Sequence, residues 1–229
     1  MMSHPDMSNP DDEHRKSGRG PRPLARAGVP RRRLPADERR GEIVAAVVAL
    51  AAEGGPDAVT TQAVADRVGV TQAAIFRHFP DKATLWAAVF DWAEEALGEA
   101  LAPAFAAPAG PVAAFEAVFL AHTEFVARHP GVPRILFHEL QHAVDTPFRA
   151  RARGLVERYR GRIEALLKRA KANGELPSGL DEQAAAMLFV GTVQGLFMQA
   201  AAQRGELSLR ASARRVLPLL KAAIGAAAT

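Results

Sequence analysis

Cysteine is absent from the 229 residues of this chain, which excludes disulfide bonds, thiolate metal sites and thiol redox chemistry. Any metal site would therefore need histidine, aspartate or glutamate ligands. No apolar run follows the charged, proline-containing N-terminus, so the sequence predicts no signal peptide and a cytoplasmic location. Patterns typical of β-strands are nearly absent as well, and an all-α fold is therefore expected.

The chain does contain enough apolar residues for a sizeable core, because 48% of its residues are hydrophobic. Its length suits one medium domain, or a small domain joined to a larger one. The formal net charge is +4, a small excess that favours an anionic partner such as nucleic acid.

Part of the positive charge lies near the N-terminus. Residues 1–36 have few large apolar side chains, contain several prolines and end close to the run "RRR" at 31–33. Such a segment cannot build a core, so we predict a disordered basic N-terminal arm. The arm is placed either to contact DNA phosphates and a minor groove or to act as a solvated tail, and both interpretations stay open.

One uncharged stretch, "QAAAMLFVGTVQGLFMQAAAQ" at 183–203, is long enough to be tested as a membrane span. The polar residues Gln194 and Gln199 inside it argue against that interpretation. A buried helix at a helix–helix interface explains the stretch better, because Gly191 and Gly195 allow a second backbone to approach closely. We therefore expect no membrane partner.

Helical periodicity extends over nearly all of the remaining chain and predicts about nine helices. The expected helices, separated by glycine, proline or a capping residue, lie at about 37–53, 61–68, 72–79, 82–101, 111–128, 131–143, 147–173, 181–204 and 208–226.

The most informative pattern is a helix-turn-helix within residues 60–79. Thr60 suits the N-cap of a short helix, and Gly69 can adopt the positive φ that ends it. A tight turn would follow, after which Ile75 and Phe79, four residues apart, bury the inner face of a second helix.

The outer face of that second helix carries residues suited to DNA. Thr71 is placed to cap the helix. The face itself presents Gln72, Ala73, Arg77 and His78, with Ala74 and Phe76 at its margins. Small residues let a helix enter the major groove deeply, while glutamine and arginine side chains hydrogen-bond to base edges.

Lys82 lies at an electrostatically unfavourable position. It follows the expected N-cap Asp81 and places a cation in the first turn of a helix, where the helix dipole favours an anion. A DNA phosphate at that helix end would accept the free backbone N–H groups and pair with Lys82. A lysine at this helix end is therefore consistent with a phosphate contact.

The stretch "TTQAVADRVGVTQAAIFRHFPDK", residues 60–82, resembles the DNA-binding domain of the TetR/AcrR family of transcriptional regulators. The matching positions are Thr60, Val64, Ala65, Gly69, Val70, Phe76, His78, Phe79 and Lys82. The chain departs from the family at Phe76, where tyrosine is usual, so a phenolic contact to phosphate is missing.

The resemblance implies a DNA-binding domain at 37–97, followed by a ligand-binding and dimerisation domain at 98–229. It also implies a homodimer formed through about 181–226, a double-stranded DNA operator and a small-molecule effector. The residues expected to contact DNA are Thr60, Thr61, Thr71, Gln72, Ala73, Ala74, Phe76, Arg77, His78 and Lys82.

No motif names an effector, and no cofactor is predicted. Side chains that could line an apolar cavity, or could equally be ordinary core, are Trp86, Phe90, Phe115, Phe119, Phe125, Phe137, Met187, Phe197 and Met198, with His122, His138 and Gln194 as polar points. The single Tyr159 gives no better signal.

The sequence "HELQH" at 138–142 has the H-E-x-x-H spacing of zinc metallopeptidases, in which two histidines share one helix face. A convincing third ligand is lacking, since nothing fixes Glu157 or Glu164 as a partner. The same pair, His138 and His142, would suffice for a metal-sensing regulator. Solvated or hydrogen-bonded histidines are the simplest interpretation, and an enzyme is not expected.

Together these patterns predict a dimeric transcription factor, most simply a repressor released from a pseudo-palindromic operator by a small molecule. Ligand would favour a spacing of the two recognition helices that no longer matches successive major grooves, about 34–36 Å apart.

Overall fold

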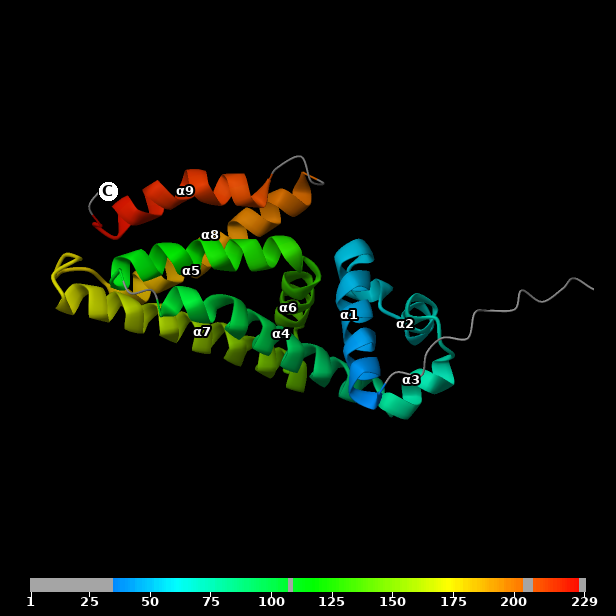
Figure 1. Ribbon diagram of the computed structural model, residues 1–229. Coiled ribbons are helices and arrows are strands. Elements are labelled where there is room, and N and C mark those ends of the chain that lie inside the picture. The colour runs from blue at the N-terminus through cyan, green and yellow to red at the C-terminus, as the bar shows by residue number, and fades with distance from the viewer. Residues whose placement is uncertain (1–34, 107–108, 204–207, 227–229) are drawn as a thin grey trace, which may run out of the picture. The chain divides into compact units, whose positions relative to one another are not determined.

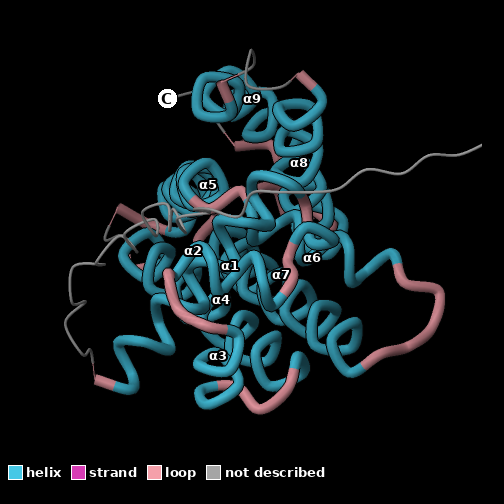
Figure 2. Tube along the Cα trace, turned by 90° about the vertical axis from the view of Figure 1, so that its right-hand side faces the viewer, coloured by secondary structure: helices cyan, strands magenta, loops and turns pink. Residues whose placement is uncertain are grey.

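The computed structural model describes residues 35–106, 109–203 and 208–226. Over these residues the chain forms nine α-helices and one short 3-10 helix, and no strand (Figures 1 and 2). The elements are α1 (Ala36–Gly54), η1 (Pro56–Ala58), α2 (Thr61–Val68), α3 (Gln72–His78), α4 (Lys82–Phe105), α5 (Pro111–Arg128), α6 (Gly131–Gln141), α7 (Pro147–Ala172), α8 (Glu182–Ala202) and α9 (Leu209–Ala223). The predicted all-α fold is confirmed, whereas the arm predicted for 1–36 lies outside the described residues up to Leu34.

Several helix ends differ from the sequence prediction; α9, for example, ends at Ala223 rather than near residue 226. Helix α4 continues past Pro103 to Phe105, because Leu101 is buried and the Phe105 ring packs under the guanidinium of Arg162 at 3.9 Å. These contacts hold the last turn on the core. Helix α6 ends at Gln141, so His142 has extended backbone angles and lies just outside the helix that was expected to include it.

The N-caps of the helix-turn-helix form as predicted. The Oγ1 atoms of Thr60 and Thr71 accept hydrogen bonds from the backbone N–H groups three residues on, at 3.1 and 3.2 Å. Gly69 adopts φ 71° and ψ 45°, the left-handed conformation that terminates α2. Asp81 caps α4 through its bond from the Thr84 N–H at 2.6 Å. These local interactions set the direction of α3 relative to its neighbours.

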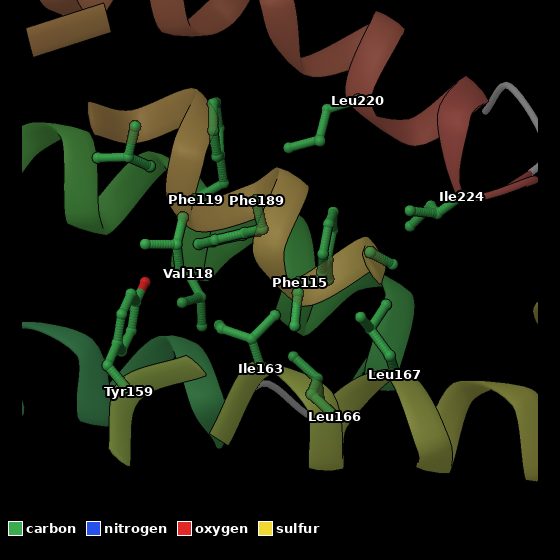
Figure 3. Packing of buried hydrophobic residues seen from close by; sticks show 14 of the residues in the cluster. Phe115, Val118, Phe119, Tyr159, Ile163, Leu166, Leu167, Phe189, Leu220 and Ile224 are labelled. Atoms are coloured by element: carbon green, nitrogen blue, oxygen red, sulfur yellow. The ribbon is translucent and has the colours of Figure 1, made fainter. Parts of the chain in front are cut away.

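Buried apolar residues form two clusters. The first joins α1, α2, α3 and the start of α4, and it also includes Ile135 of α6 and Ala152 of α7. The second joins α5, α7, α8 and α9 around edge-to-face rings, with Phe189 against Phe115 at 4.9 Å and Phe119 at 5.4 Å (Figure 3). The two clusters are therefore physically connected through α6 and α7.

Helix α6 makes an unusually close contact with α1. A Cβ atom added to Gly131 would lie 2.0 Å from the carbonyl oxygen of Val48. Only glycine permits this approach, since any side chain would collide with the backbone of α1. In Figure 1 α6 stands beside α1, and α4 runs from α3 toward α5 and α7. The first residue of α6 is thus fixed against the helix that supports the helix-turn-helix.

Helix α8 is the one described helix that is long and apolar enough to cross a membrane by length and composition. A core helix of a soluble protein meets the same criterion. One face of α8 is buried in the second cluster, at positions such as Phe189 and Val193. The opposite face leaves Met187, Leu188 and Met198 exposed.

Candidate nucleic-acid interface and apolar pocket

Helix α3 presents a defined surface to solvent. Ile75 and Phe79 are each 1% exposed and hold the helix on the first cluster, as the sequence predicted. Gln72 and Arg77 are exposed, and the Phe76 ring is 47% exposed. A large apolar ring with this exposure is suited to contact with another molecule, such as a thymine methyl group in a major groove.

Arg40 of α1 fixes the far end of α3. Its Nη1 donates a hydrogen bond to the backbone oxygen of His78 at 2.5 Å, and its guanidinium lies 4.3 Å from the centre of the Phe79 ring. A cation at the C-terminal end of a helix also opposes the partial negative charge there. This contact could not be predicted from the sequence, because nothing along the chain shows which α1 arginine reaches α3.

A hollow of about 290 Å³ opens beside α3, between η1, α2 and the start of α4. Thr60, Thr61, Phe76 and Lys82 are among its walls. The remaining residues of the expected DNA-contacting set lie on or next to α3, and they are Thr71, Gln72, Ala73, Ala74, Arg77 and His78. Of the ten residues, Thr61, Ala74 and His78 are half-buried and the others are exposed. The fold therefore gathers the predicted set on three consecutive elements.

The N-terminus of α4 combines Asp81 and Lys82. Hydrogen bonds from the Thr84 backbone and hydroxyl to the Asp81 carboxylate lower the pKa of that carboxyl. The ionised Asp81 offsets part of the unfavourable charge of Lys82 at this helix end. Lys82 itself is exposed and makes no ion pair within the part of the chain that the structure describes. Its ammonium group is therefore available to a phosphate.

A second concave site is an apolar pocket of about 70 Å³ enclosed by α4, α5, α6, α7 and α8. The sixteen residues that line it are Ala93, Leu97, His122, Phe125, Val126, Val132, Pro133, Leu136, Phe137, Leu155, Val156, Tyr159, Val190, Val193, Gln194 and Phe197. Five of them, His122, Phe125, Phe137, Gln194 and Phe197, had been expected in such a wall. None of the lining residues carries a charged side chain.

Seven other residues expected in the wall lie elsewhere. Phe115 and Phe119 pack in the core on Phe189, and Phe90 lies parallel to Phe148 with ring centres 6.0 Å apart. Trp86 lines the hollow beside α3 instead.

The other three, Met187, Met198 and His138, also lie apart from the pocket. Met187 and Met198 are 60% and 53% exposed because they lie on the outer face of α8. His138 faces His142. Helical periodicity identified buried faces but could not show which gap between helices stays open.

His122 and Tyr159 meet inside the pocket. Their rings are edge-to-face, with centres 4.9 Å apart and planes at 85°. Burial lowers the pKa of His122 to about 4, so the imidazole is neutral near pH 7. Burial also raises the pKa of the Tyr159 hydroxyl above its usual range. Figure 3 shows Tyr159 on α7 with its hydroxyl oxygen pointing away from that helix.

The lowered pKa of His122 predicts a pH-dependent stability. An unfolded histidine binds a proton near pH 6.5, whereas the folded one resists protonation until about pH 4. The stabilising contribution is therefore present above pH 6.5 and lost as pH falls toward 4, by about 3 kcal/mol in total. Denaturant unfolding between pH 7 and 4.5 should show this loss, and His122→Phe should remove most of it. An unchanged slope in that variant would contradict the assignment.

The "HELQH" side chains do come together. Rings of His138 and His142 are edge-to-face with centres 4.9 Å apart, although His142 lies beyond the end of α6. One ligand atom from each of His138, Glu139 and His142 lies within 4.8 Å of the others. No fourth metal-binding side chain joins this group among the described residues. The geometry suits a surface metal ion better than a closed catalytic site.

Comparison with known proteins gives the family. Residues 43–89 match the model of bacterial regulatory proteins of the tetR family, and residues 138–216 match the model of the tetracyclin repressor-like C-terminal domain. The chain belongs to the TetR family. The two matches together span more than half of it and leave residues 90–137 between them. This TetR-family protein is a DNA-binding transcriptional regulator, and the function predicted from the helix-turn-helix is confirmed at that level.

Individual relatives are distant. The nucleoid occlusion factor SlmA of Vibrio cholerae is 29% identical over 158 residues, covering 69% of this chain and 81% of that protein. The regulator FadR from Bacillus subtilis, solved with stearoyl-CoA, has a TM-score of 0.66 and 21% identity, covering 79% of this chain and 96% of that chain. AibR, solved with isovaleryl coenzyme A and operator DNA, has a TM-score of 0.66 and 20% identity, covering 79% and 97%. At these identities the two structures show the shared fold.

Proposed function

We propose that this protein is a cytoplasmic, homodimeric repressor that leaves its operator when a small molecule occupies the pocket between α4 and α8. The observation that carries the proposal is the connection between two sites. Helix α3 exposes Gln72, Phe76 and Arg77, while two of the helices that line the pocket, α4 and α6, pack directly on α1. The likeness to FadR and AibR, which were solved with CoA thioesters, supports a small molecule as the effector.

The proposed dimer interface is the exposed face of α8 together with α9. Met187, Leu188 and Met198 are large apolar side chains left in solvent along one face of α8. Gly191 and Gly195 lie on the same side, and a Cβ atom added to either would have no neighbour within 4 Å. A second α8 can therefore approach this stripe closely. In this proposal α8 is a core and dimer helix, and no membrane is a partner.

The proposed route from the pocket to DNA runs through α6. Phe137 on α6 lines the pocket, and Gly131 at the start of the same helix touches the Val48 carbonyl of α1. Displacing Phe137 would shift α6 and, through this backbone contact, α1. Because Arg40 of α1 holds the end of α3, the recognition helix would follow. Ligand would thus favour a different spacing of the two α3 helices.

Substituting Gly131 tests this contact. Gly131→Ala places a methyl group against the Val48 carbonyl, so α6 must separate from α1, at a cost of about 1–3 kcal/mol. Gly41→Ala is the matched control, because its added Cβ has no neighbour within 4 Å and alanine favours the helix. Thermal unfolding should show a lower melting temperature for the first variant and an equal or higher one for the second. Equal melting temperatures for both variants would exclude a tight α6–α1 contact.

We propose no catalytic role for "HELQH". An H-E-x-x-H peptidase uses its glutamate as the general base, so Glu139 in that role would leave zinc with two histidines and no third protein ligand among the described residues. The protein incubated with zinc is therefore expected not to hydrolyse a general peptide substrate, and Glu139→Gln to change nothing. Zinc-dependent hydrolysis that disappears in Glu139→Gln would overturn this proposal.

A metal-sensing regulator is the second candidate, favoured by the closeness of the His138, Glu139 and His142 ligand atoms. Divalent zinc would then release the operator, and His142→Ala would abolish that release. If an apolar compound releases the operator and His142→Ala does not change that release, the apolar pocket is favoured as the effector site instead.

The proposed repressor is tested with an operator duplex selected from random DNA. Compounds that raise the melting temperature of the protein are added to the labelled complex, and fluorescence anisotropy measures dissociation. A compound that binds in the pocket is expected to weaken operator binding at least tenfold. If pocket ligands strengthen operator binding instead, the effector promotes DNA binding and the proposal of ligand-induced release is wrong.

A further inference from the structure

Two hydrogen-bonding atoms in the pocket have no partner in the protein. The Nδ1 atom of His122 and the hydroxyl of Tyr159 are both buried, and neither has a hydrogen-bond partner within the described residues. Tyr159 is only 7% exposed. Native proteins pair nearly all such groups, because an unpaired polar group loses its water without replacement. Both unpaired atoms belong to residues that line the same apolar pocket. This indicates that a bound molecule supplies the missing hydrogen-bond partners.

The rest of the wall limits the chemistry of that molecule. None of the sixteen lining side chains is charged, and most are aliphatic or aromatic. A carboxylate, phosphate or ammonium group inside would be desolvated without a counter-ion, which is strongly unfavourable. The part of the ligand that enters must therefore be uncharged and mainly apolar. Gln194, half-buried at the wall, adds a third polar contact of neutral character.

We propose that the pocket binds an apolar chain or ring bearing a carbonyl oxygen, which accepts a hydrogen bond from the Tyr159 hydroxyl and lies against the His122 imidazole. The inference rests on the proposed function, since it names the class of effector for the same pocket. A phenol donates one hydrogen bond, and a carbonyl oxygen has two lone pairs that can accept it and a second from an imidazole N–H. The neutral state of His122 fits this role, because an imidazolium ion would favour an anionic ligand instead.

Size indicates how the ligand enters. The pocket of about 70 Å³ holds only a few heavy atoms as it stands. Phe137 of α6 and Phe197 of α8 form part of its wall, with ring centres 5.8 Å apart. A longer ligand must push these rings aside, which moves α6. A free carbonyl compound and the acyl part of a thioester share the required chemistry, and the charged portion of a thioester would remain outside.

The experiment uses three probes of equal chain length, 2-octanone, octanoate and octanoyl-CoA, with the full chain. The protein has a single tyrosine, so incorporation of 3-fluorotyrosine gives one fluorine NMR signal from Tyr159. We expect 2-octanone to shift this signal saturably and to bind at least tenfold more tightly than octanoate at pH 7.5. The same shift with octanoyl-CoA would identify a thioester as the source of the carbonyl. Tighter binding of octanoate, or no shift with any probe, would overturn the inference.

Two hydroxyl deletions provide the matched comparison. Tyr159→Phe removes an unpartnered hydroxyl, so it should weaken 2-octanone binding about tenfold while leaving the melting temperature of the free protein unchanged or higher. Thr123→Val removes a buried hydroxyl that donates to the Leu120 carbonyl at 2.9 Å. That control should lower the melting temperature without changing 2-octanone affinity. A lower melting temperature with unchanged affinity in Tyr159→Phe would assign its hydroxyl a purely structural role and contradict the proposal.

The outcome for DNA binding is separate. If 2-octanone binds through Tyr159 but leaves operator affinity unchanged, the inference about the pocket holds and the proposed ligand-released repressor fails. If octanoate binds preferentially and releases the operator, the repressor stands and the inference fails.

Discussion

Replacing Gly191 with glutamate is expected to convert the protein from a dimer to a monomer and to weaken operator binding about a hundredfold or more. Gly191 lies on the exposed face of α8, where a second copy of the helix is proposed to pack. A charged side chain at this position would keep the two backbones apart and would bury a carboxylate without a partner. Each recognition helix would then bind its half-site alone and lose the gain from linked binding.

The substitution should not harm the fold of the single chain. A side chain at position 191 has open space around it, and glutamate favours a helix interior by roughly 0.5–1 kcal/mol over glycine. Gly161→Glu is the matched control, because Gly161 is an exposed glycine in α7 with equally open surroundings. Light scattering after size exclusion and anisotropy titration of the operator measure the two effects. A Gly191→Glu protein that remains dimeric would place the interface elsewhere.

Substitutions in the helix-turn-helix should separate sequence recognition from attachment to the backbone of DNA. Arg77 and Gln72 are exposed on α3, so we expect them to contact base edges, arginine suiting guanine and glutamine suiting adenine. Alanine at either position should cost about 1–3 kcal/mol per half-site on the preferred operator and less on a variant at the contacted base pair. Specificity should therefore relax.

Lys82 should behave differently, because it lies at the N-terminus of α4 rather than on α3. Lys82→Ala is expected to weaken binding to all sequences alike and to lower the salt slope by about one unit per half-site. Competition binding over operator variants at two salt concentrations measures both effects, with circular dichroism as the control for folding. If Lys82→Ala changed base preference while Arg77→Ala and Gln72→Ala did not, the placement of the recognition helix would be wrong.

The helix-turn-helix could be predicted from sequence because its determinants are local. A threonine cap acts on the N–H three residues on, and Gly69 ends α2 through its own backbone angles. Periodicity likewise indicated that Ile75 and Phe79 face inward, and both are buried. Each of these interactions spans only a few residues, so it can be predicted from the local sequence without knowledge of the rest of the fold.

The pocket could not be predicted in the same way, because it arises where five helices meet. Aromatic residues at helical spacing indicate a buried face, yet Phe119 fills the core while Phe137 lines a gap. Tyr159 lies among the arginines of α7, and its position in the sequence gives no sign of the neutral pocket that it enters. The contacts of Arg40 with α3 and of Gly131 with α1 are also long-range. Such pairs follow from packing between helices that one sequence does not specify.

Selection of binding sites from random duplex DNA measures how this protein reads its operator. The purified full chain is expected to enrich a two-fold symmetric sequence, with half-site centres about 34–36 Å apart, and to bind it as a dimer. The Arg77→Ala variant should enrich the same symmetry with relaxed preference at one base pair in each half. Enrichment of no sequence, or of a single asymmetric site bound by one chain, would contradict a dimeric regulator that reads DNA through α3.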